Sequence, residues 1–304
     1  MRALRDGDTF SSILLFIIMG DKGAKLTICS WVDWWTVDND VSPRRLLDVR
    51  SIDQVADDSM KRLVSSNNND LIVVHIPLQE LQERRFELPP RQVSFAILIH
   101  TLDDVPSLCE ILHAPQPWNI TGLLLADEAF WHEAQEHGVN VRTDAHIDNS
   151  QHPQPRLWQP DPMIQTVLLP LLQLHHHRGG KDRVIWDLGS GVGRDACFLA
   201  EEVVGRIRVV GWDQRYRDPV HNKARAFWKR RGVDSHTVCK CVNLHDITSV
   251  LAQLNDSVVC VYAVRYWNRP LFQALATAIT SPGTIVAISQ FGKPEIGAPW
   301  PFAH

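Results

Sequence analysis

The sequence predicts an α/β protein of two domains, each built on a mainly parallel sheet. Short unbroken apolar runs alternate with helical stretches in both halves of the chain, as is typical of strands buried on both faces. A polar, proline-containing stretch separates the halves. The length of 304 residues suits two domains of ordinary size. We expect an uncertain apolar lead (1–28), a first domain (29–141), a linker (142–162) and a second domain (163–304).

The expected elements follow from these runs. In the first domain we expect strands over 46–50, 70–77, 95–100 and 121–126, and helices over 79–86 and 128–137. In the second we expect a helix over 163–174, broken or bent at Pro170. Strands should then cover 184–188, 207–212, 238–242, 258–263 and 284–291. Helices should cover 194–204, 220–231, 247–254 and 271–280, which gives a doubly wound sheet.

Composition excludes several classes of protein. Hydrophobic residues make up 44% and charged residues 22%, which excludes a mainly disordered chain or a rod. The formal charge of -4 argues against a surface that is basic overall, so the charge of the whole chain makes nucleic acid an unlikely partner. Six scattered cysteines indicate reduced thiols and a cytoplasmic protein. Cys239 and Cys241 would lie on one face of a strand, but no second pair has a zinc spacing, so we expect no metal site.

The apolar run Ile13–Met19 is too short to span a membrane. Asp6 and Asp8 cancel the positive charge that a signal peptide needs, and we expect no membrane association. The run either packs as a short buried element or does not belong to the working protein, in which case Met19 is a sensible alternative start.

A glycine-rich loop at 187–195 carries the strongest functional signal. It follows an expected strand and opens an expected helix, where glycines allow close approach of a ligand and the helix N-terminus favours anionic groups. Arg194 stands where a dinucleotide fingerprint has its third glycine, which argues against that ligand class. Asp213 ends the next strand, where a carboxylate can accept hydrogen bonds from both hydroxyls of a ribose.

This D-x-G-x-G-x-G loop with its following acid resembles class I S-adenosylmethionine-dependent methyltransferases over about residues 156–292. The segment Val261–Phe272 is similar to the fourth-strand region of tellurite-resistance-like methyltransferases, and Ser281–Thr284 to their K-P-G-G turn. The resemblance implies a Rossmann-like sheet with S-adenosylmethionine as cofactor.

The resemblance also implies roles for single residues. Asp187 and the loop glycines would hold the methionine end of the cofactor, and Asp213 the ribose. The implied cofactor-binding residues are Asp187, Gly189, Ser190, Gly191, Gly193, Asp213, Gln214, Asn243, Leu244 and Ala263. Many relatives have Asp at the Asn243 position. Arg265 and Tyr266 are the catalytic candidates because they could bind a small or anionic methyl acceptor. It is equally consistent that Arg265 and Arg269 only flank a helix start.

Two other functions stay open for this domain. One is a scaffold that binds the cofactor and methylates nothing. The other is a nucleic-acid methyltransferase that uses the basic helix 220–231, although Phe227 and Trp228 are better explained as packing on the sheet. The absence of an N/D-P-P-Y/F motif argues against methylation of a base amino group. His175–His177 is more typical of a solvated helix end than of a metal site.

The first domain resembles a rhodanese-like domain. The resemblance rests on three motifs: L-L-D-V-R at residues 46–50, H-I-P at 75–77, and a closing helix over 126–138 that contains Trp131. A sulfurtransferase needs a thiolate directly after the central strand, but His100–Asp104 contains no cysteine. Cys109 is expected to be a core thiol on a helix. We therefore expect no sulfurtransferase activity.

The last expectation concerns the fifth strand of the second domain. The resemblance implies seven strands, but the proline-containing segment Gly292–His304 cannot supply two more. The sheet would then lack its last two strands, and Ile285–Ser289 would form an apolar edge. This edge could be covered by the tail, by a protein partner or by a second subunit, unless the sequence itself is clipped.

Overall fold

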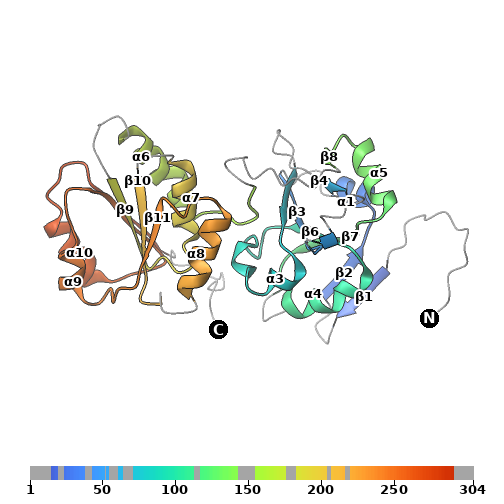
Figure 1. Cartoon of the computed structure of the whole chain (residues 1–304), viewed down its shortest axis with the longest axis horizontal. Coiled ribbons are helices and arrows are strands. Elements are labelled where there is room, and N and C mark those ends of the chain that lie inside the picture. Colours follow the sequence, from blue (N-terminus) through green and yellow to red (C-terminus); the bar gives the residue numbers. More distant parts are fainter. Residues whose placement is uncertain are drawn as a thin grey trace, which may run out of the picture. The chain divides into compact units, whose positions relative to one another are not determined.

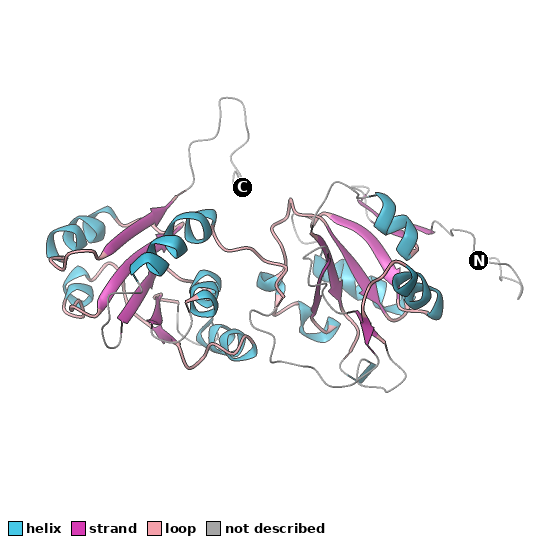
Figure 2. Ribbon diagram, turned by 90° about the horizontal axis from the view of Figure 1, so that it is seen from above, coloured by secondary structure: helices cyan, strands magenta, loops and turns pink. Residues whose placement is uncertain are grey.

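The computed structural model describes residues 15–19, 24–37, 43–51, 53–54, 61–63, 71–112, 117–142, 155–175, 183–203, 207–215 and 220–290. The chain divides into two compact units, Met1–Gln159 and Pro160–His304. The division falls inside the stretch expected to be a linker. Figure 1 labels most elements of the two units, and Figure 2 shows helices on both faces of each sheet.

Unit 1 contains a six-stranded sheet in the order β1-β2-β7-β6-β3-β5. β1 is antiparallel to β2, and the remaining neighbours are parallel. Its strands are β1 (Leu15–Met19), β2 (Ala24–Ile28), β3 (Arg44–Asp48), β5 (Leu71–His75), β6 (Phe95–Ile99) and β7 (Ile120–Leu125). A separate antiparallel pair is formed by β4 (Arg62–Leu63) and β8 (Val141–Arg142). The helices are α1 (Trp31–Val37), α3 (Leu78–Leu81), α4 (Val105–Leu112) and α5 (Glu128–Glu136), with 3-10 turns η1 (Arg85–Glu87) and η2 (Leu102–Asp104).

β6 shows why continuous apolar runs form the centre of this sheet. All five of its residues are buried. Ile97 and Ile99 pack into the apolar cluster on one face, and Ala96 and Leu98 into the cluster on the other. The alternation of side chains along a strand thus serves two layers of core.

One helix of the first unit differs from expectation, and one open question about the N-terminal run is answered. The helix expected over 79–86 is wrong as a single element, because α3 ends at Leu81 and a separate turn covers Arg85–Glu87. Leu88 then becomes extended, as a residue before proline prefers. Part of the uncertain N-terminal lead belongs to the sheet, since β1 pairs with β2 in the register Leu15 to Ile28.

Unit 2 contains a five-stranded parallel sheet in the order β11-β10-β9-β12-β13. Its strands are β9 (Arg183–Leu188), β10 (Ile207–Trp212), β11 (Thr237–Lys240), β12 (Val258–Val264) and β13 (Ile285–Ser289). The helices are α6 (Leu169–His175), α7 (Arg194–Glu202), α8 (Val220–Arg230), α9 (Ile247–Leu251) and α10 (Arg269–Ala278), and η3 (Ile164–Leu168) is a π-helical turn before α6. All five expected strands are present in a Rossmann-like, doubly wound arrangement. The strand order reverses around β9, which makes a topological switch point there.

One local expectation for unit 2 is confirmed and one is wrong. The helix expected over 163–174 is interrupted next to Pro170, since a π-helical turn covers Ile164–Leu168 and runs directly into α6 at Leu169. β11 ends at Lys240, so Cys241 lies beyond the strand and does not share a face with Cys239. Among the described residues, no group of His, Cys, Asp and Glu side chains is arranged so that it could hold a metal ion.

The packing of α8 and the position of β13 agree with expectation. Ala224, Phe227 and Trp228 of α8 are buried. β13 is the last strand of the described sheet, and its Val286 is 42% exposed. The segment Gly292–His304, which was expected not to supply two further strands, lies outside the described residues. No helix in the described part of the chain is both long and apolar enough to cross a membrane.

Candidate functional site

The glycine-rich loop leaves β9 at the switch point and contacts the end of β10. Gly189 and Ser190 donate backbone hydrogen bonds to the Trp212 carbonyl oxygen, at 2.7 and 3.3 Å. Gly189, Gly191 and Gly193 all have positive φ, from 58° to 75°, which only glycine adopts without strain. The loop conformation therefore requires glycine at all three positions.

Side chains from other elements pack directly on two of these glycines. A Cβ atom on Gly189 would lie 2.7 Å from Cβ and Cγ of Tyr266, so Tyr266 covers the loop. A Cβ atom on Gly193 would lie 2.4 Å from Cζ2 of Trp228, whose Nε1 donates to the Gly193 carbonyl oxygen at 3.0 Å. Gly193 thus serves the packing of α8 against the start of α7.

Asp213, at the end of β10, is held by four hydrogen bonds. Its Oδ1 accepts from the backbone N and from Nε of Arg215, at 2.8 and 3.2 Å. Its Oδ2 accepts from Nη2 of Arg215 at 3.1 Å and from the backbone N of Gly191 at 2.9 Å. Burial alone would raise the pKa of Asp213, but the hydrogen bonds from Arg215 and Gly191 hold it below its usual value.

Asp187, at the end of β9, has the opposite electrostatic environment. Its side chain is buried, and burial together with the nearby Asp195 raises its pKa well above the usual value, against a smaller lowering effect of Tyr262. Asp195 accepts a hydrogen bond from the backbone N of Asp161 at 2.9 Å. A cation placed next to Asp187 would favour its ionised form.

The loops after β11 and β12 are joined by Asn268. Its Nδ2 donates to the Leu244 carbonyl oxygen at 2.9 Å, and its Oδ1 caps α10 by accepting from the backbone N of Leu271 at 3.2 Å. Asn243 is exposed, and its Oδ1 accepts from the backbone N of His245. The loop therefore presents Leu244 and His245, rather than Asn243, to the switch point.

Arg265 follows β12 with an unusual backbone conformation. Its φ of 58° is the only positive value among the described residues other than glycine. Its backbone N donates to the Ser289 carbonyl oxygen at 2.8 Å, and the Tyr266 carbonyl oxygen accepts from Nε2 of Gln290 at 2.7 Å. A strained residue held in place by its surroundings is often part of a functional site.

These loops enclose a cavity of about 320 Å³ at the carboxyl edge of the sheet. Its lining residues are Gly189, Asp213, Gln214, Arg215, Leu244, His245, Arg265 and Tyr266. Six of these were candidates from the sequence. The sequence analysis did not single out Arg215 and His245, although Arg215 directly follows the candidate Gln214 and His245 directly follows the candidate Leu244. Asp187, Ser190, Gly191, Gly193, Asn243 and Ala263 are not among the lining residues, and Ala263 is fully buried in the core.

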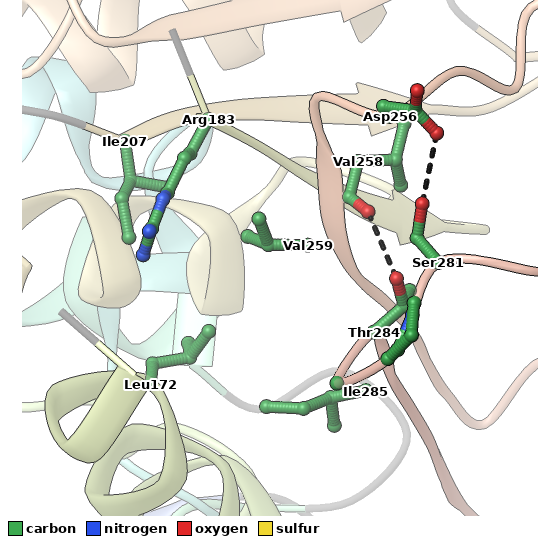
Figure 3. Close-up of a pocket in the computed structure, with 11 residues that line it drawn as sticks. Leu172, Arg183, Ile207, Asp256, Val258, Val259, Ser281, Thr284 and Ile285 are labelled. Carbon is green, nitrogen blue, oxygen red and sulfur yellow. Dashed lines mark hydrogen bonds between the residues drawn. The ribbon is translucent and has the colours of Figure 1, made fainter. Parts of the chain in front are cut away.

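A smaller cavity lies at the opposite, amino edge of the same sheet (Figure 3). It measures about 110 Å³ and lies beside the first residues of four strands. Ser281 donates to Asp256 at 2.8 Å, and Thr284 donates to the Val258 carbonyl oxygen at 3.3 Å. Ligands of open α/β sheets bind at the carboxyl edge, so the cavity beside Asp213 is the candidate site.

No protein-family model matches the chain, and no curated protein matches it. Among solved structures, a methyltransferase from Thiobacillus denitrificans in complex with S-adenosyl-L-homocysteine is 18% identical, with a TM-score of 0.31, and the match covers 42% of this chain and 48% of that one. A methyltransferase from Geobacter sulfurreducens, also in complex with S-adenosyl-L-homocysteine, is 19% identical, with a TM-score of 0.30. That match covers 47% of this chain and 51% of the other protein. An RNA methyltransferase from Salinibacter ruber is 25% identical, with a TM-score of 0.29 and coverage of 42% and 75%. The matched region spans about half the length of the first two proteins. All three TM-scores are low, so the fold assignment rests on the strand order of this chain.

Proposed function

We propose that unit 2 binds S-adenosylmethionine at the carboxyl-edge cavity and transfers its methyl group to an acceptor that carries negative charge. The observation that carries this proposal is the position of two carboxyl groups, Asp187 and Asp213, at the ends of adjacent strands on either side of the glycine loop. The cavity lined by Asp213 and Gly189, with a volume of about 320 Å³, lies within the size range of small-molecule sites.

The residues present suit this cofactor. Asp187 provides a buried carboxyl group for a cationic amino group, and ionic pairing would offset the cost of its burial. Asp213 provides two carboxylate oxygens for ribose hydroxyls, provided that Arg215 moves aside. The bound cofactor supplies an electrophilic methyl group on a sulfonium.

The remaining lining residues favour an anionic acceptor. Arg215 and Arg265 both line the cavity, and the strained backbone places Arg265 at the end of β12. Transfer to a reactive nucleophile needs mainly correct positioning, so these residues and Tyr266 can act by orienting the acceptor and excluding water. A scaffold that binds the cofactor without methyl transfer is the alternative that activity measurements address.

Titration calorimetry with S-adenosylhomocysteine tests the cofactor part. The wild-type chain should bind, and Asp213→Ala should lose about 1.5–3 kcal/mol of binding free energy, as expected for hydrogen bonds to a charged group. Unchanged affinity in this variant would contradict the assignment of Asp213. Absence of methyl transfer to every anionic acceptor, despite binding, would leave the scaffold function as the better account.

We infer that unit 1 is a rhodanese-like domain without sulfurtransferase activity. Its L-L-D-V-R motif covers the end of β3, where Asp48 and Arg50 form a buried ion pair at 2.7 Å. Nε2 of His75 lies 2.7 Å from the Arg50 carbonyl oxygen, and the Arg50 guanidinium lies 5.0 Å from the centre of the Trp131 ring. The three quoted motifs thus converge on one buried cluster, which supports the resemblance.

The loop after β6 supports the inactive assignment. Asp104 accepts from the backbone N of Thr101 at 3.2 Å, so it caps η2 and presents a negative charge where a sulfur donor would approach. Cys109 lies on α4 in the core, and burial raises the pKa of its thiol. A thiosulfate assay should detect no thiocyanate. Thiocyanate formation that disappears in Cys109→Ser would overturn this inference.

A further inference from the structure

A groove lined by basic side chains lies between α8 and the edge strand β11 of unit 2. Its volume of about 480 Å³ exceeds that of the cavity beside Asp213. One wall carries His221, Arg225 and Lys229 from α8, and the other carries Val238 and Cys239 from β11. α8 and β11 lie side by side (Figure 1).

The groove is positively charged. Arg225 and Lys229 are exposed, and neither forms an ion pair within the part of the chain that the structure describes. α8 contains no acidic residue, and Lys223 and Arg230 add to its charge. Among the described residues, Asp234 is the only acidic one that lines the groove. The groove therefore favours an anionic occupant.

The basic residues form a row that leads toward the cofactor cavity. His221, Arg225 and Lys229 are spaced four residues apart, so they share one side of α8, about 6 Å apart along its axis. Because α8 follows the carboxyl end of β10, its His221 end faces the carboxyl edge. The loop after β10 carries Arg215 to that cavity.

An exposed aromatic ring lies just beyond the two cavity residues that follow β12. Trp267 directly follows Tyr266 and is 56% exposed. Its ring stacks on Phe272 with centroids 5.5 Å apart and planes 24° apart. An indole held flat by a second ring provides a ready surface for stacking of another planar group.

We propose that unit 2 binds single-stranded nucleic acid, with phosphates in the α8–β11 groove and a base stacked on Trp267. A basic groove combined with exposed aromatic rings is how sequence-tolerant single-strand binding works. In the strand order the groove lies at β11 and Trp267 follows β12, and the loops after β9 and β10 that line the cavity come between them, so a nucleic-acid strand bound to both would pass the cavity. This proposal rests on the proposed function, because the bound nucleic-acid strand would carry the group that accepts the methyl.

Other anionic surfaces fit less well. A lipid surface requires an apolar helix side to insert, but the apolar side of α8 is buried in the core. An acidic protein would have no particular use for the exposed ring. The expectation that nucleic acid is not a partner came from the net charge of -4, which sums the whole chain and does not register a row of basic residues on one helix.

Fluorescence anisotropy with labelled RNA and DNA oligonucleotides of about 12 residues tests the proposal on the full chain. We expect binding of one or both probes that weakens steeply with salt. Arg225→Glu combined with Lys229→Glu should weaken it at least about tenfold and reduce the salt slope by about 1.4. Arg208→Glu, a charge reversal at an exposed position of β10 outside the groove, should change it much less. Trp267→Ala should weaken it, and Trp267→Phe should retain most of the affinity.

Three results would overturn the proposal. These are absence of binding to both probes, equal affinity in the double variant, and equally strong competition by polyglutamate, which would indicate an acidic protein instead. Calorimetry with S-adenosylhomocysteine on the same samples separates the two proposals. Cofactor binding without oligonucleotide binding defeats only this one, and the reverse defeats only the cofactor assignment.

Discussion

Arg215 occupies the acceptor positions of Asp213, with three of the four hydrogen bonds that the carboxylate receives. A carboxylate has about four lone-pair sites, so ribose hydroxyls can bind only after the guanidinium leaves. The side chain of Arg215 is 66% exposed, which leaves it room to move.

Arg215→Ala should therefore tighten cofactor binding. Because the Arg215 end of this ion pair is exposed to solvent, we expect the pair to stabilise the ligand-free site by about 1 kcal/mol, which corresponds to a gain in affinity of about fivefold. Calorimetric titration with S-adenosylhomocysteine measures it, and Arg208→Ala controls for the lost positive charge. Weaker binding in Arg215→Ala would mean that Arg215 helps to hold the cofactor.

Asp187→Asn should stabilise the ligand-free protein at neutral pH. Burial raises the pKa of Asp187 in the folded state above the 3.8 of the free side chain. The wild-type chain therefore loses stability as the pH rises from that value through the folded-state pKa, and the variant does not. Urea unfolding should show a larger stability difference at pH 8 than at pH 5. A stability difference that is the same at both pH values would contradict the role of burial.

Gly193→Ala should destabilise more than Gly138→Ala. Both glycines have similar positive φ, 71° and 75°, so both substitutions carry backbone strain of about 1–2 kcal/mol. A Cβ atom added at Gly138 would meet open space, whereas a Cβ atom added at Gly193 would lie 2.4 Å from Cζ2 of Trp228. Displacing the indole should add about 1–3 kcal/mol. Equal losses of unfolding free energy in the two variants would show that this contact is unimportant.

Arg50→Ala should strongly destabilise unit 1. The Arg50 side chain is fully buried and pairs with Asp48, so its removal leaves a buried carboxylate without its cation, at a cost of about 3–5 kcal/mol. Glu128→Gln disrupts the exposed ion pair with Lys61 and should cost at most about 1 kcal/mol. Chemical unfolding compares the two, and a small effect of Arg50→Ala would sink this interpretation.

The sequence allowed prediction of the second sheet and of its switch point because unbroken apolar runs mark buried parallel strands. It also placed Asp187, the glycine loop and Asp213 at strand ends, since position along a strand is a local property. Which residues face the cavity depends on loop conformation, and this is why His245 lines the cavity and Asn243 does not. Arg215 could not be predicted, because an ion pair over two residues requires knowledge of the turn after β10.

Titration of the wild-type chain with S-adenosylhomocysteine and, separately, with NADH tests the central claim most directly. If the loop of Gly189, Gly191 and Gly193 together with Asp213 forms a site for S-adenosylmethionine, then S-adenosylhomocysteine should bind with clear saturation and more tightly than NADH. Tighter binding of NADH, or no binding of S-adenosylhomocysteine, would contradict the account.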